Sequence, residues 1–167
     1  SAYSKLTLAA IFLMIAQFSF AQVKETREVS NFNELSISSA FIVELSVGST
    51  ESLEIEAEDR YMEDIITEVR NGRLTIKIRD SRNTRRMRDS PRAYLTVTSL
   101  EMIDLSGAVK LTTFDPLKGD RLRVNMSGAS VAKLEVEVED LKIEASGASE
   151  IKQSLEDQIA IRRAALK

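Results

Sequence analysis

The feature that most constrains the fold of this 167-residue chain is a short unit that occurs three times in its second half. Each copy is Ser-Gly-Ala, at residues 106–108, 127–129 and 146–148, and follows a segment of alternating apolar and polar residues. Alternation is typical of a strand with one buried face, and a repeat of about 20 residues with such strands indicates a stacked solenoid. We therefore predict an all-β fold, a right-handed single-stranded parallel β-helix, because crossovers between parallel strands are overwhelmingly right-handed.

The small residues of this unit have a structural explanation. We expect the Ser-Gly-Ala steps to stack at one corner of the solenoid, where small residues permit a tight turn and close approach of neighbouring coils. A serine beside a glycine can be a catalytic nucleophile, and Ser106, Ser127 and Ser146 each stand beside one. A serine nucleophile needs an adjacent base to activate it, so we favour the structural explanation for all three. The chain has no histidine and no cysteine, which removes Ser-His-Asp triads, cysteine nucleophiles and most zinc or copper sites. We predict no enzyme activity, no catalytic residue, no cofactor and no metal.

The first half of the chain shows the same alternation with one interruption. Apolar residues alternate over 35–47, 53–57 and 74–78, with turns expected at Gly48-Ser49 and Asn71-Gly72. Between these segments, apolar residues at 61, 62, 65, 66 and 69 follow helical spacing, and Asp59 is suited to cap a helix start. We predict one short helix over residues 59–69.

The two ends of the chain differ in composition from the rest. Lys5 and an apolar run over residues 6–18 precede Ser19-Phe20-Ala21, which predicts a signal peptide at residues 1–21. A run of this length is short of the roughly 20 residues that span a membrane, so we expect no membrane span after cleavage. The rest, residues 22–167, is predicted to be one domain, exported to the periplasm, the outer-membrane surface or the extracellular medium. Residues 155–167 have helical spacing and are expected to cap the solenoid, unless the chain is truncated there.

Residues 79–92 contain six arginines, two aspartates and almost nothing to bury. This composition predicts an exposed loop. Guanidinium groups bind carboxylate, sulfate and phosphate, so we predict that Arg82, Arg85, Arg86 and Arg88 contact an anionic ligand such as an acidic glycan or a lipopolysaccharide phosphate. A solvated loop without a ligand is the simpler explanation.

Two further groups of residues were candidates for binding. Glutamates recur at 51, 54, 56 and 58 and at 135, 137 and 139, where they could serve as calcium ligands or an acid/base pair. Their alternation with apolar residues is explained more simply as the outer faces of strands. Aromatic residues are sparse after residue 21, and most occur in apolar patterns that favour the core, so no strong lectin platform is predicted. They are Phe32, Phe41, Tyr61, Tyr94 and Phe114.

The order of several motifs resembles one protein family. The motifs are VSNFNEL at 29–35, SAFIVELSVG at 39–48, EVRNGRLTI at 68–76 and the three Ser-Gly-Ala units. Over about residues 27–152 the chain is similar to the head GIN domain family of putative auto-transporter adhesins, which is common in Bacteroidetes envelopes. The resemblance implies an exported, right-handed β-helical domain of unestablished molecular function, and it carries over no catalytic residue.

These observations leave three functions to compare. The first is a binding or adhesion module that contacts a polysaccharide or an envelope protein. The second is a structural envelope domain that forms a homo-oligomer through the solenoid ends, and the third is a polysaccharide-active enzyme. Without the predicted signal peptide the chain has 22 basic and 26 acidic residues, a mild acidic balance that gives no general attraction to nucleic acid.

Overall fold

The computed structural model describes residues 21–153. The predicted signal peptide up to residue 20 and the predicted helical tail lie outside the described residues. The strands of the described part are β1 (Gln22–Arg27), β2 (Glu34–Ile37), β3 (Ile42–Val47), β4 (Ser52–Glu58), β5 (Ile65–Arg70), β6 (Arg73–Ile78), β7 (Arg92–Val97), β8 (Met102–Leu105), β9 (Lys110–Thr113), β10 (Leu117–Met126), β11 (Val131–Leu134), β12 (Val136–Ala145) and β13 (Glu150–Gln153). Two short helices, η2 (Asp59–Asp64, 3-10) and α2 (Ser81–Thr84), complete them.

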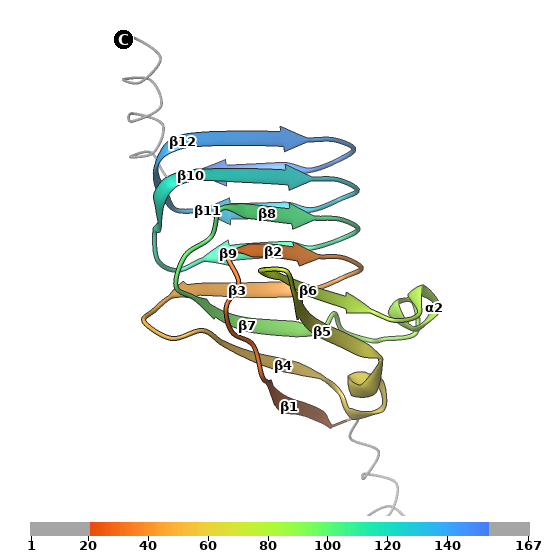
Figure 1. Cartoon of the computed structure of the whole chain (residues 1–167). Helices are drawn as coiled ribbons and strands as arrows, with labels where there is room; N and C mark the ends of the chain where they lie inside the picture. Colours follow the sequence, from red (N-terminus) through yellow and green to blue (C-terminus); the bar gives the residue numbers. More distant parts are fainter. Residues whose placement is uncertain (1–20, 154–167) are drawn as a thin grey trace, which may run out of the picture.

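The strands form two sheets, largely parallel, that stack as shown in Figure 1. Sheet A has the order β1-β4-β7-β3-β9-β11-β13, and sheet B has the order β12-β10-β8-β2-β6-β5. The chain passes from sheet B to sheet A at β2–β3, β6–β7, β8–β9, β10–β11 and β12–β13, and each such pair is called a rung here. The strands of successive rungs pair in parallel, so each rung lies directly on the next.

The buried core is a set of apolar rows that run across the rungs. Leu74, Leu35, Ile103 and Val124 follow one another in register on β6, β2, β8 and β10, and each is fully buried. The same row ends at Ile143 on β12, which is 36% exposed because the described residues contain no further rung beyond it. The alternation that predicted strands therefore also identified the buried faces.

The prediction of a parallel arrangement throughout is wrong at the other end of the stack. Strands β1 and β4 extend sheet A by antiparallel pairing, and β5 extends sheet B in the same way. The reason for β5 is local: Asn71 and Gly72 have φ of 51° and 76°, the left-handed conformation of a two-residue hairpin turn, and a hairpin joins antiparallel strands.

The predicted helix over residues 59–69 is only partly present. A 3-10 helix covers Asp59–Asp64, and the rest of the segment is strand β5. Asp59 is not the cap, because Glu58 occupies that position and makes no capping hydrogen bond with its side chain. Ile65, Thr67 and Val69 are β-branched and also fit a period of two, so pairing with β6 across the Asn71-Gly72 turn prevails over the helical spacing.

The Ser-Gly-Ala units stack at the corners, where each rung turns from sheet B to sheet A. Gly107, Gly128 and Gly147 have φ between 71° and 86°, and a Cβ on Gly128 would lie 2.5 Å from the carbonyl oxygen of Gly107. Each corner also hydrogen-bonds to the previous one, with Ala129 N donating to Gly107 O at 2.8 Å. Ser39 takes this position in the first rung with φ 80°, so the stack contains a fourth corner that lacks glycine.

Candidate functional site

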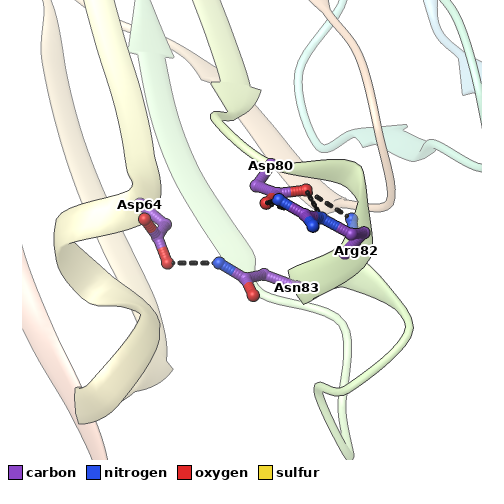
Figure 2. Close-up of polar contacts among 4 residues, drawn as sticks. All are labelled: Asp64, Asp80, Arg82 and Asn83. Atoms are coloured by element: carbon purple, nitrogen blue, oxygen red, sulfur yellow. Dashed lines mark hydrogen bonds and ion pairs between the residues drawn. The ribbon is translucent and has the colours of Figure 1, made fainter.

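The arginine-rich segment forms an anchored loop between β6 and β7. The Asp80 side chain caps α2 by accepting from Arg82 N at 2.8 Å, and it also binds the Arg82 guanidinium, with Nη2 to Oδ2 at 2.8 Å. Asn83 Nδ2 donates to Asp64 Oδ2 at 2.6 Å, which ties α2 to the end of η2. Figure 2 shows both contacts. Pro91 is buried, Met87 packs against the core and Arg92 begins β7, so the segment is attached to the domain at several points and is not the fully exposed loop that its composition predicted.

The buried carboxylate of Glu58 anchors the other side of this loop. Its Oε1 accepts from Arg88 N at 2.8 Å, and its Oε2 accepts from Arg60 Nε at 3.0 Å and Nη2 at 2.8 Å. Burial raises the pKa of Glu58, but the hydrogen bonds from Arg88 N and Arg60 outweigh it, so the pKa lies below its ordinary value. Glu58 therefore keeps the outward alternation of Glu54 and Glu56, but Arg60 and the arginine-rich loop bury it there.

The structure does not bring the four candidate arginines into one cluster. The guanidinium of Arg82 is engaged by Asp80, and the Arg88 backbone is held by Glu58. Arg85 and Arg86 are exposed and make no ion pair within residues 21–153, although Arg86 is close enough to Asp80 to contribute to lowering its pKa. Of the four, Arg85 and Arg86 are thus the side chains with no ion-paired carboxylate in the described part.

The predicted glutamate rows are used in different ways. Glu54 binds Lys24 Nζ at 2.9 Å, Glu56 Oε2 accepts from the Tyr94 hydroxyl at 2.6 Å, and Glu51 accepts from Asn31 N at 2.8 Å. The Glu56 hydrogen bond raises the pKa of Tyr94, and that from Lys24 to Glu54 raises the pKa of Lys24. Glu135, Glu137 and Glu139 are exposed at or near β12. Within residues 21–153 no group of three acidic side chains is placed to hold a metal ion.

The corner serines line a shallow groove of about 390 Å³ on the outer face of sheet B. Asp104, Asn125 and Glu144 lie beside them on β8, β10 and β12, and Asn125 Nδ2 donates to Asp104 Oδ1 at 2.7 Å. A hydrogen bond from Lys142 lowers the pKa of Glu144, so this carboxyl is ionised rather than poised as an acid. Ser146 Oγ donates to Met126 O at 3.4 Å, a bond between rungs that fits the structural explanation of the serines.

A second groove, of about 350 Å³, crosses the outer face of sheet A. Phe114, which follows β9, lies in it with 58% of its surface exposed. Phe32, Phe41 and Tyr61 are buried, which agrees with the prediction that most of the five rings favour the core, whereas Tyr94 is half-buried and Phe114 is exposed. Its position in the alternation was the available signal: Leu111 and Thr113 face inward, so Phe114 faces outward.

Two sheets of stacked, largely parallel rungs, with exposed polar faces and an anchored cationic loop, define a repetitive β-rich domain. The family model described as "Putative auto-transporter adhesin, head GIN domain" matches residues 31–156, and the chain belongs to this family. No curated protein matches the chain at a significant level. No helix within residues 21–153 has the length and apolar character that crossing a membrane requires.

Solved structures show the same fold. The chain is similar to putative adhesins from Parabacteroides distasonis (TM-score 0.72, 16% identity, covering 81% of this chain and 57% of that one) and Parabacteroides merdae (0.71, 18%, 81% and 57%). A putative adhesin from Bacteroides fragilis has a TM-score of 0.73 at 17% identity, over 80% of this chain and 62% of that one. The chain thus spans less than two thirds of the length of these structures.

Proposed function

We propose that this protein is an exported, non-catalytic binding module of a cell-envelope adhesin, and that its arginine loop recognises acidic glycans or anionic surface partners. The family match supports adhesion, and the predicted signal peptide supports export to the periplasm, outer-membrane surface or medium. The proposed fold is a right-handed β-helix. Parallel pairing of successive rungs at a repeat of 19 to 21 residues supports it.

The observation that carries the anion-binding proposal is the state of the loop. Glu58 binds the loop backbone at Arg88 N, Asp64 binds the Asn83 side chain, and Asp80 within the loop caps α2 at Arg82 N. Arg85 and Arg86 remain exposed with no ion pair in the described residues. A loop that is already held in place loses less conformational entropy when a ligand binds, so the free-energy cost of binding is smaller. Guanidinium groups bind carboxylates and sulfates through two parallel hydrogen bonds, which suits acidic polysaccharides.

The test compares two double variants with equal loss of charge. Arg85→Ser with Arg86→Ser removes the exposed loop cations, and Arg121→Ser with Arg123→Ser removes two exposed cations on β10. We expect the loop variant to bind acidic glycans about tenfold or more weakly, the β10 variant to bind as wild type, and binding to weaken with salt. Changing Arg82 and Arg88 as well should abolish binding. Equal losses in both double variants would show a general charge effect and refute the proposal.

A structural role in the envelope is the second candidate, and one observation favours it. The last described rung leaves Leu141 and Ile151 only partly buried and Ile143 36% exposed. A partner that continues the stack, including a second copy of the chain, would cover these side chains. This function predicts self-association of the purified protein and no effect of the loop variants, which sedimentation and the binding assay above distinguish from adhesion.

A polysaccharide-active enzyme is the third candidate and has the weakest support. Asp104 and Glu144 lie two strands apart, with Asn125 between them, and Glu144 has a lowered pKa. A general acid needs a raised pKa instead, so the groove on sheet B lacks a suitable donor pair.

A further inference from the structure

Phe114 lies in a groove whose other side chains are suited to a ligand rich in hydroxyl groups. One exposed ring is by itself unremarkable on a protein surface. Here, however, the register places Ser52, Thr96 and Ser46 side by side on β4, β7 and β3, and Phe114 next in the same row. None of the three hydroxyl groups makes a hydrogen bond within residues 21–153. The row therefore offers three hydroxyls and an aromatic face to a molecule that crosses the strands.

The spacing of this row suits a chain of sugars. Neighbouring strands lie about 4.8 Å apart, so successive side chains in the row recur at nearly the length of one hexopyranose unit. A sugar ring has an apolar face that stacks on aromatic rings and an edge of hydroxyls that both donate and accept hydrogen bonds. An oligosaccharide that runs perpendicular to the strands would place one ring on Phe114 and the next rings over the hydroxyls.

The backbone around Phe114 is held before any ligand arrives. Phe114 N donates to Leu45 O at 2.9 Å, which continues the pairing of β9 with β3. The carboxylate of Asp115 accepts from Val47 N at 3.0 Å, and Pro116 follows with its restricted φ. A fixed backbone lowers the entropic cost of using this ring as a binding platform.

The charges around the groove favour an uncharged ligand. Glu54 and Glu44 line it, and each is paired with a cation, Lys24 at 2.9 Å and Arg92 at 3.6 Å respectively. A sulfated or carboxylated sugar would meet two carboxylates whose partner cations are already engaged. The hydroxyls of a neutral sugar, in contrast, can donate to the same carboxylate oxygens.

From the exposed ring, the hydroxyl row and the compensated charges we infer a second binding site: a neutral oligosaccharide binds across the outer face of sheet A, with one sugar stacked on Phe114. This site is independent of the arginine loop. The loop precedes the start of β7, whereas Phe114 follows the end of β9, and β7 and β9 both lie parallel to β3, so the two sites lie at opposite ends of the strands.

The test uses the purified protein on an array of uncharged oligosaccharides of hexoses and N-acetylhexosamines, followed by titration calorimetry with the tightest binder. We expect Phe114→Ala to weaken binding about tenfold or more and Thr96→Val to weaken it by a smaller factor. Ile143→Ala is the matched control, because Ile143 is the other exposed large apolar side chain of the described residues. We expect this control, the Arg85/Arg86 double variant and high salt to leave binding unchanged.

Three results would overturn this inference. They are no binding to any neutral oligosaccharide, equal binding by wild type and Phe114→Ala, or equal losses in Phe114→Ala and Ile143→Ala. The first would leave a protein partner as the explanation of the exposed ring. Because the arginine-loop variants are measured on acidic glycans and Phe114→Ala on neutral ones, failure at one site does not count against the other. Thermal unfolding of each variant verifies that a loss of binding is not a loss of fold.

Discussion

Single residues at the corners determine how closely the rungs stack. Gly107, Gly128 and Gly147 each turn the chain with positive φ, and each lies against the backbone of the previous corner. Glycine is required here for two reasons, the backbone conformation and the absence of space for a Cβ. Ser39 occupies the first corner, which lies against the start of the β6–β7 connection, with Ile78 N donating to Ser39 Oγ at 3.4 Å, rather than against another Ser-Gly-Ala corner. Its φ of 80° is tolerated by a short polar side chain at some cost.

The contribution of close stacking can be separated from that of backbone conformation. Gly128→Ala would place a Cβ 2.5 Å from Gly107 O, whereas Gly72→Ala, at nearly the same φ of 76°, would have only the Asn33 side chain nearby, at 3.4 Å. We expect Gly128→Ala to lower the free energy of unfolding by at least about 2 kcal/mol more than Gly72→Ala does. Urea denaturation measures this difference, and equal losses would mean that the corners are not tightly stacked.

The buried Glu58 makes the stability depend on pH. Its pKa in the folded protein lies below its ordinary value of about 4.3, so the ionised carboxylate stabilises the fold at neutral pH. As pH falls below about 4.3 and through the folded pKa, the carboxylate is protonated and this contribution disappears. We expect wild type to exceed Glu58→Gln in unfolding free energy above about pH 5, with the difference shrinking at lower pH. A difference that persists unchanged to pH 3 would contradict this role.

At the scale of elements, local patterns predicted the repeated strands well and the irregular ones poorly. Alternation identified β6 and the strands before the Ser-Gly-Ala units, β8, β10 and β12, because each displays its apolar positions directly. The four-residue strands after these corners, β9, β11 and β13, were not predicted individually. Strand β1 was not predicted, since Val23 is its single apolar residue and its pairing with β4 depends on distant residues. The 59–69 segment fits two periods, and its pairing with β6 decides between them.

The candidate site was predictable only in part. Composition located the arginine loop, but the engagement of Arg82 by Asp80 and of the Arg88 backbone by Glu58 arises from three-dimensional contacts. The position of Phe114 could have been found from the alternation of β9. Its hydroxyl neighbours could not, because Ser52 and Thr96 come from strands whose order in the sheet does not follow the sequence.

The arginine loop is an element whose order depends on few contacts. Asn83→Ala removes the 2.6 Å hydrogen bond to Asp64 that ties α2 to η2. We expect faster hydrogen exchange at the amides of α2 and the following turn, with a loss of only about 1 kcal/mol in global stability. Ser90→Ala is the control, since Ser90 is exposed in the same loop. Unchanged exchange in Asn83→Ala would show that the other anchors suffice.

At the scale of the whole molecule, the middle rungs of residues 21–153 are covered on both sides, whereas the described residues contain no rung beyond β12–β13. Leu122 on β10 and Leu141 on β12 are register partners in the same row, but Leu122 is 1% exposed whereas Leu141 is only partly buried. In a stack each rung is stabilised mainly by its neighbours, so the end rung contributes less. This difference can be measured with one substitution made in two places.

We expect Leu122→Ala to lower the free energy of unfolding by about 2–5 kcal/mol and Leu141→Ala to lower it by less than half as much. The two variants delete the same atoms from adjacent strands, so each is the control for the other. Chemical denaturation at low protein concentration gives both values. Equal losses would indicate that the last described rung is covered in solution and would contradict this prediction.

The measurement that tests the central claim most directly is binding of the purified wild-type protein to acidic and neutral glycans at low and high salt. A binding module with the two proposed sites should retain acidic glycans only at low salt and neutral oligosaccharides at both, because salt screens exposed charges and leaves stacking intact. Binding to no glycan at either salt concentration would contradict the account.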